Sequence, residues 1–223
     1  SNNSFENNTI NVSQNNGISI DGDNNLFKNL NLLGVSGTSI VLSSGAVNNT
    51  FTNATYNNES LAAGAQLIRK WYYTAHTNYT NGSVVNDGNF SGFNVTGEVQ
   101  FSFLTNSTGD IPQQELIEYV NTAGTKAYSN NYTFNITSGS YISTRSINFT
   151  IEQNLNDIFT LDNTPPTINV TSPSAQTYTV NTYLVNMTLN EAGYCEYSID
   201  EGITNSTLST TDNLTFNATV SSV

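Results

Sequence analysis

Apolar and polar residues alternate along several stretches of the chain. Tyr132, Phe134 and Ile136 are each followed by Thr or Asn, and a similar alternation runs from Ile147 to Ile151. A period of two predicts strands with one buried face. A helical period is nearly absent, because only residues 112–120 would fit a short helix, and their apolar residues also fit a buried strand edge. We therefore predict an all-β protein.

The first 60 residues contain a repeat. Segments 3–7, 25–29 and 49–53 all carry Phe between asparagines, at steps of 22 and 24 residues. Between them, the step of 22 places Ile18 on Ile40 and Ile20 on Leu42. A repeat of this length with two short strands per unit predicts stacked coils of a parallel β-solenoid. Asn at the corners tolerates left-handed backbone and can ladder its amides.

This repeat resembles the last coils of the right-handed parallel β-helices found in periplasmic and archaeal surface proteins. The resemblance covers residues 1–60. It implies a β-helix domain of about two and a half coils, fewer than the three or more repeats that usually stabilise such an array.

Residues 61–163 have a different pattern. Residues 66–78 predict one long strand that carries the only Trp, and an Asn-Gly turn at 81–82 follows. About seven strands in about 100 residues is the spacing of a β-sandwich. The order of strands and turns resembles the carboxypeptidase-regulatory or transthyretin-like sandwich that follows β-helix coils in archaeal surface proteins.

The sequence Thr164-Pro-Pro-Thr167 predicts a stiff, extended joint, since proline cannot donate to a sheet and restricts the residue before it. Beyond it, residues 168–170, 179–189, 194–199 and 214–216 predict strands. The run from Pro165 to Asp200 resembles the immunoglobulin-like repeats of archaeal cell-surface proteins. About five strands in 164–223, where such a domain has seven, imply a partial domain.

Small polar residues dominate the composition, with 37 Asn, 31 Thr and 25 Ser in 223 residues. The sequon Asn-x-Ser/Thr occurs 19 times, whereas random placement would give about nine. We therefore expect covalent N-glycans. The candidate sites are Asn2, Asn7, Asn11, Asn48, Asn53, Asn58, Asn78, Asn81, Asn89, Asn94, Asn106, Asn131, Asn135, Asn148, Asn169, Asn186, Asn205, Asn213 and Asn217. Alternating strands rich in Asn and Thr would also create sequons by geometry alone.

Charge and composition exclude several functions. The net charge is −12, and the five basic residues are scattered, so a nucleic-acid partner is not expected. One Cys and one His cannot form a thiolate or imidazole zinc site or a disulfide framework. No apolar run is long enough for a membrane span.

Individual reactive residues favour structural roles. His76 should be exposed, because Tyr73, Ala75 and Thr77 form the expected inward set. Cys195 shares its parity with Tyr197 and Ile199 and should be a buried apolar residue. The acid pairs Asp21/Asp23 and Glu191/Glu196 have no companion base or nucleophile, so we expect no catalytic residues.

Calcium is the one metal that the sequence suggests. Asn156-Asp157 and Asp162-Asn163 precede the double proline, where cadherin-like chains bind Ca²⁺ between domains. Their oxygen ligands suit calcium, although the set is incomplete. We therefore consider a calcium site at Asp157 and Asp162, and otherwise no metal or cofactor.

These features predict a structural, extracellular protein of a surface layer or filament. The alternatives are a carbohydrate-binding or carbohydrate-active β-helix protein and an adhesin that recognises other surface proteins or glycans. An incomplete solenoid and an incomplete sandwich also predict self-association, by head-to-tail stacking or a donated strand.

Overall fold

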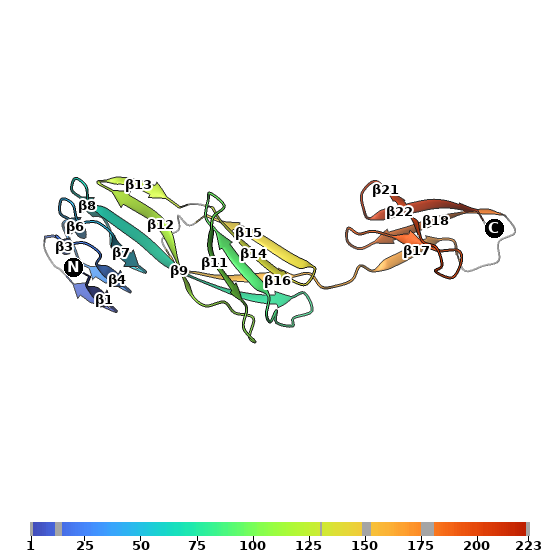
Figure 1. The fold of residues 1–223 in the computed structure, drawn as a ribbon, viewed down its shortest axis with the longest axis horizontal. Coiled ribbons are helices and arrows are strands. Elements are labelled where there is room, and N and C mark those ends of the chain that lie inside the picture. Colours follow the sequence, from blue (N-terminus) through green and yellow to red (C-terminus); the bar gives the residue numbers. More distant parts are fainter. Residues whose placement is uncertain (1, 12–14, 130, 149–152, 175–180, 222–223) are drawn as a thin grey trace. The chain divides into compact units, whose positions relative to one another are not determined.

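The computed structural model in Figure 1 describes residues 2–11, 15–129, 131–148, 153–174 and 181–221. The chain divides into two compact units, Ser1–Asn163 and Thr164–Val223, which we call the first and the second unit. Among the described residues there are strands and no helix. The prediction of an all-β protein is confirmed.

The first unit begins with short strands that pair in parallel from one repeat to the next. We call residues 2–61 the repeat region. One sheet contains β1 (Ser4–Glu6), β4 (Leu26–Lys28) and β7 (Asn49–Thr52), a second contains β2 (Thr9–Asn11) and β5 (Asn31–Leu33), and a third contains β3 (Ile18–Ile20), β6 (Ile40–Leu42) and β8 (Glu59–Leu61).

The register of these sheets is the one that the repeat predicts. Phe5 lies opposite Phe27 and Phe27 opposite Phe51, and their rings stack with centroids 5.0 and 4.5 Å apart. Ile18 lies opposite Ile40, and Ile20 opposite Leu42. Similar apolar residues therefore stack on one another from β1 to β7 and from β3 to β6, whereas at β8 Ile40 lies opposite Glu59.

Asparagines turn the chain at the corners of the repeats. Asn7, Asn29 and Asn53 have φ angles of 59°, 53° and 51°, in the left-handed region that Asn tolerates better than other side chains. Nδ2 of Asn53 donates to Oδ1 of Asn29, and Nδ2 of Asn29 donates to Oδ1 of Asn7, both at 2.8 Å. The predicted corner role of Asn and its amide ladder are both confirmed.

The long strand β9 (Gln66–Tyr79) joins the repeat region to the rest of the first unit. Its first half pairs in parallel with β7 and antiparallel with β12 (Gln114–Thr122), to which β13 (Thr125–Tyr128) is added. Its second half pairs in parallel with β16 (Leu155–Leu161). Within the segment 112–120, residues 114–120 thus belong to a strand, and none is helical. One sheet runs across the predicted boundary at residue 60.

A second sheet covers the far half of β9 (Figure 1). Its antiparallel order is β11 (Val99–Leu104), β10 (Asn89–Phe93), β14 (Tyr132–Ser138) and β15 (Tyr141–Ile147). Tyr73 of β9 stacks on Phe134 of β14 with centroids 4.3 Å apart, and Phe90 and Ile136 are fully buried beside them. The alternation predicted for β14 is confirmed, whereas residues 149–151 lie outside the described part.

The second unit forms two further sheets. One has the order β17 (Ile168–Ser172), β18 (Thr182–Leu189), β22 (Thr215–Ser221) and β21 (Ser209–Thr210), and the other pairs β19 (Glu196–Tyr197) with β20 (Ser206–Thr207). Residues 179–180 of one predicted strand lie outside the described part. Only Glu196 and Tyr197 of the predicted strand 194–199 pair, because the chain turns at Asp200, which accepts a hydrogen bond from the Thr204 N–H.

Candidate functional site

Three turns of the first unit hold a sequon asparagine in the same way. Oδ1 of Asn81, Asn94 and Asn106 accepts hydrogen bonds from both the N–H and the hydroxyl of the residue two positions later. The N–H bonds measure 2.9, 3.0 and 2.9 Å, and the hydroxyl bonds 2.7, 2.7 and 2.8 Å. These are Asx turns, in which a short amide side chain replaces a backbone acceptor.

Two of these turns are copies of one motif. Residues 94–98 and 106–110 both read Asn-x-Thr-Gly-acid, and in both Oδ1 also accepts from the N–H of the acidic residue at 2.9 Å. Gly97 and Gly109 have φ angles of 82° and 80°, which glycine adopts without steric cost. The sequence therefore specifies both the turn and the orientation of its amide.

This geometry is compatible with a sugar on the amide nitrogen. An N-glycan attaches to Nδ2 and leaves Oδ1 as a carbonyl acceptor, so all of the Oδ1 bonds would survive attachment. Asn81 and Asn106 are exposed, and their Nδ2 groups donate no hydrogen bond to the described part of the chain. Nδ2 of Asn94 donates to Glu98 at 3.0 Å and retains a second hydrogen.

No sequon asparagine is buried. The exposed ones are Asn2, Asn7, Asn11, Asn48, Asn58, Asn81, Asn89, Asn106, Asn131, Asn148, Asn169, Asn205, Asn213 and Asn217, and the half-buried ones are Asn53, Asn78, Asn94, Asn135 and Asn186. The hydroxyl residues of the sequons at Asn11 and Asn148 lie outside the described part. Among the described asparagines, none of the three buried ones, Asn25, Asn49 and Asn121, is the acceptor asparagine of a sequon.

Two of the half-buried sites are less suited to a glycan. Asn135 lies on the central strand β14, and its Oδ1 is buried. Asn53 donates through Nδ2 to Asn29 and accepts at Oδ1 from Asn154 at 3.0 Å, so both polar atoms of this half-buried side chain are engaged with neighbouring segments. Asn135 and Asn53 are therefore weaker candidates for a glycan than Asn81, Asn94 and Asn106.

The two acids considered for calcium do not converge. Asp157 is 7% exposed and forms an ion pair with Arg145, whereas Asp162 accepts a hydrogen bond from the Thr80 hydroxyl. Asp162 is five positions after Asp157 and just past the end of β16, a span of roughly 16 Å at ~3.3 Å per residue. In the described part of the chain, no group of three His, Cys, Asp or Glu side chains could hold a metal ion.

The other singled-out residues make local contacts. His76 is half-exposed, with its Nδ1 2.9 Å from Oδ1 of Asp110, while Tyr73, Ala75 and Thr77 point inward as predicted. Hydrogen bonds from Thr108 and His76 hold the pKa of Asp110 below its ordinary value.

Cys195 is buried as predicted, but Ile199 is 48% exposed, because the chain leaves the core at the turn that follows. Asp21 and Asp23 bind Ser43 and Val47 of the next repeat, and Glu196 accepts from Tyr194.

A buried polar cluster lies where the repeat region meets β9 and β12, and the sequence analysis does not anticipate it. The Arg69 guanidinium lies 4.5 Å from the ring centroid of Tyr56 and 4.9 Å from that of Trp71. Its Nε is 3.4 Å from Oε2 of Glu118, which also accepts from Trp71 Nε1 at 2.6 Å. One signal was present: Arg69 has the same parity as the buried Leu67, Trp71 and Tyr73 on β9.

A second carboxylate, Glu59, extends this cluster. Its Oε2 accepts from the hydroxyls of Tyr56 and Tyr119 at 2.6 and 2.8 Å, and its Oε1 accepts from Asn121 at 2.7 Å. Burial acts to raise the pKa of Glu59, but these three hydrogen bonds outweigh it and lower the pKa. Burial raises the pKa of both tyrosines.

Every Lys and Arg of the chain has a carboxylate partner. The pairs are Lys28 and Lys70 with Glu115, Arg69 with Glu118, Lys126 with Glu59, and Arg145 with Asp157. With a net charge of −12, the exposed surface therefore has no unpaired cation of these types to bind phosphates.

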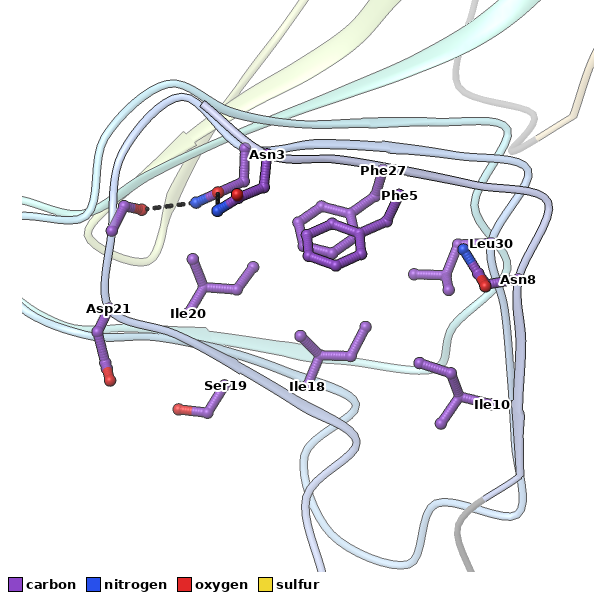
Figure 2. A pocket seen from close by; sticks show the side chains of 12 residues that line it. Asn3, Phe5, Asn8, Ile10, Ile18, Ser19, Ile20, Asp21, Phe27 and Leu30 are labelled. Carbon is purple, nitrogen blue, oxygen red and sulfur yellow. Dashed lines mark hydrogen bonds between the residues drawn. The ribbon is translucent and has the colours of Figure 1, made fainter. Parts of the chain in front are cut away.

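A pocket of about 400 Å³ lies over the inner face of the first repeat (Figure 2). Phe5, Ile10, Ile18 and Ile20 point into it, and a hydrogen bond from Nδ2 of Asn3 to Oδ1 of Asn25 in the next repeat borders it. These residue positions match those that the deeper repeats bury against each other. The pocket is therefore the packing face of a repeat rather than a polar binding site.

A scan against protein-family models and a search of curated proteins found no match to this chain. Within the described residues, no helix offers the length and apolar character that a membrane crossing requires.

Proposed function

We propose that this chain is part of a glycosylated, non-catalytic structural protein of the cell exterior, in a surface filament or an S-layer-like lattice. The observation that carries the proposal is the placement of its sequons. Nineteen are present, none of their asparagines is buried, and three lie in Asx turns that engage Oδ1 and leave at least one Nδ2 hydrogen without a partner in the described part of the chain. A protein whose surface is specified for sugar attachment belongs where glycosylation takes place, outside the cytosol.

The finer architecture belongs to the same proposal. Parallel strands in three sheets, with like residues stacked from repeat to repeat, support a right-handed parallel β-helix for the repeat region. Two sheets sharing one aromatic core support a transthyretin-like sandwich for the rest of the first unit. The antiparallel sheet of the second unit supports an immunoglobulin-like sandwich. This combination resembles archaeal surface proteins.

The charge distribution supports a scaffold rather than a receptor for anions. All five cations are engaged inside the first unit, and three of them link the repeat region to β9, β12 or β13. Edge strands β11, β13 and β15 expose most of their residues, and edges of this kind can pair with another chain. We therefore propose head-to-tail or strand-donated contacts between copies.

Glycopeptide mapping of native material tests the modification. The expected result is occupancy at Asn81, Asn94 and Asn106 above that at Asn135. Thr108→Ser keeps the hydroxyl and should keep the sugar at Asn106, whereas Thr108→Val should remove it. Thr125→Val, outside any sequon, is the matched control. Native protein at the bare mass of 24.2 kDa per chain of this length would refute the proposal.

Imaging tests the structural role. Electron microscopy of the native cell surface should show this protein in ordered filaments or lattices. Specific binding on a glycan array by dispersed protein without ordered polymers would instead favour an adhesin or a carbohydrate-binding protein.

A further inference from the structure

Three side chains with complementary chemistry meet at the hairpin formed by β12 and β13. Oε1 of Glu59 accepts a hydrogen bond from Nδ2 of Asn121 at 2.7 Å and lies 3.4 Å from Nζ of Lys126. One carboxylate oxygen thus contacts both an amine and a carboxamide nitrogen. The distance between Nδ2 of Asn121 and Nζ of Lys126 is therefore at most the sum of these two contacts.

The strand geometry holds the amine and the amide side by side. Asn121 of β12 lies directly opposite Lys126 of β13, one step from the two-residue turn at Ala123 and Gly124. Because hydrogen-bonded and non-hydrogen-bonded pairs alternate, this is a position where facing side chains approach most closely. Facing Cβ atoms are roughly 4.5–5.5 Å apart there, well within the reach of a lysine.

The surroundings of the amide leave its carbonyl open. Asn121 is 2% exposed, and its Oδ1 is a buried acceptor with no hydrogen-bond partner in the described structure. Glu59 is held in place by the hydroxyls of Tyr56 and Tyr119, and Lys126 Nζ lies 4.2 Å from the ring centroid of Tyr119.

We propose that Lys126 and Asn121 form an intramolecular amide cross-link, with Glu59 as the proton carrier. The ammonium of Lys126 passes one proton to the Glu59 carboxylate, and the neutral Nζ attacks Cγ of Asn121. Glu59 returns the proton to Nδ2, the bond between Cγ and Nδ2 breaks, and ammonia leaves. The new bond joins Nζ to Cγ, the second proton of Nζ passes to the departing ammonia, and no oxidant or reductant is required.

The charges around the site predict a slow, single-turnover reaction. Burial acts to lower the pKa of Lys126, but contacts with Tyr119 and Glu59 outweigh it and raise the pKa. The ion pair is therefore the resting state, and proton transfer to Glu59 is uphill. The Lys126 side chain is 35% exposed, so solvent base can also remove its proton. The titratable groups that face it are Glu59 from β8 and Tyr119 from β12, with Tyr56 and Arg69 behind them. The cross-link should thus accumulate with time, faster under mildly alkaline conditions.

High-resolution mass spectrometry of the aged full chain tests the proposal. The expected product is lighter than the sequence by one ammonia. Trypsin should then fail to cut after Lys126 and release residues 71–145 as one peptide that contains the ring. Fragmentation of this peptide in the mass spectrometer should give no backbone fragment ions from cleavage between residues 121 and 126.

Matched variants separate chemistry from folding. Lys126→Arg keeps the charge beside Glu59 but has no amine to acylate, and Glu59→Gln removes the proton carrier; both should retain the full mass. Lys28→Arg is the control. Lys28 also pairs with a carboxylate, that of Glu115 at 2.5 Å, but the other side-chain hydrogen bond to this carboxylate comes from the Thr52 hydroxyl and not from an amide. Its aged form should lose ammonia like the parent chain. An aged, folded parent chain at full mass, cut normally after Lys126, would overturn the proposal.

Discussion

The buried pair of Arg69 and Glu118 provides the sharpest test of how the first unit is held together. The two side chains are only 5% and 2% exposed, with Nε and Oε2 3.4 Å apart. Arg69→Met removes the cation and leaves the Glu118 carboxylate buried with the indole N–H of Trp71 as a donor. An uncompensated buried charge costs about 3–5 kcal/mol. The loss of two close cation–π contacts adds about 1–2 kcal/mol.

The double variant Arg69→Met, Glu118→Gln isolates the charge effect. The glutamine side chain introduced by Glu118→Gln has no charge, and its carbonyl can still accept from Trp71. The uncompensated charge is then absent, so the double variant should lose only about 1–2 kcal/mol. The double variant is expected to be more stable than Arg69→Met alone, whereas additive effects of two destabilising substitutions would make it less stable.

Urea unfolding monitored by tryptophan fluorescence measures these differences. Trp71 is the only Trp of the chain and lies in the cluster itself, so the signal reports the first unit and not the second. Lys28→Met is the control, because its partly exposed ion pair should contribute less than about 1 kcal/mol. A loss below about 1 kcal/mol for Arg69→Met, or a double variant less stable than the single one, would refute the reasoning.

Three further outcomes follow from the structure. Burial raises the pKa of Tyr56 and Tyr73, so the folded state favours their protonated forms. The free energy of unfolding should therefore keep its full tyrosine contribution below the ordinary tyrosine pKa of 10.0 and fall as pH rises above it, which denaturation curves at a series of pH values would measure. Gly109→Ala should lower the melting temperature more than Gly124→Ala. Both glycines have positive φ, but a Cβ at Gly109 would lie 2.4 Å from the Thr77 carbonyl oxygen, whereas a Cβ at Gly124 would meet nothing within 4 Å. Equal losses for the two variants would contradict this reasoning. Association between copies, measured by sedimentation, should strengthen with added salt, because a net charge of −12 repels like chains, and insensitivity to salt would argue against an electrostatic barrier.

The parts of the fold that the sequence predicts are those set by local period. The repeat of Phe and Ile positions determines the register, since an aromatic or branched side chain stacks best on its own kind, and the stacks of Phe5, Phe27 and Phe51 follow. Alternation determines the inward face of β14. The sequence Ser107-Thr-Gly-Asp110 also predicts a turn, and the structure has one there, but the acceptor role of the Asn94 and Asn106 Oδ1 atoms was not predicted.

The polar cluster depends on contacts that no local pattern contains. Arg69 meets Tyr56 and Glu118, which are 13 and 49 positions away along the chain. A β-bulge between Ile117 and Tyr119 shifts the register of β12, so both Glu118 and Tyr119 are buried although they are consecutive. Alternation alone would assign them to opposite faces. The inward parity of Arg69 was the available clue, and a lone cation on a buried face implies a buried anion nearby.

The few basic residues of this acidic chain have a structural role that follows from where their ion pairs lie. Lys28 of the repeat region pairs with Glu115 of β12, Glu59 of the repeat region pairs with Lys126 of β13, and Arg69 lies between the two regions. The cations therefore concentrate where the stacked repeats join the long sheet, a junction that parallel pairing of β7 with only four residues of β9 would secure weakly by itself. Pairs in a partly buried junction are screened by salt less than pairs in open solvent. The junction should hence stay closed at ionic strengths that reduce repulsion between copies of the chain.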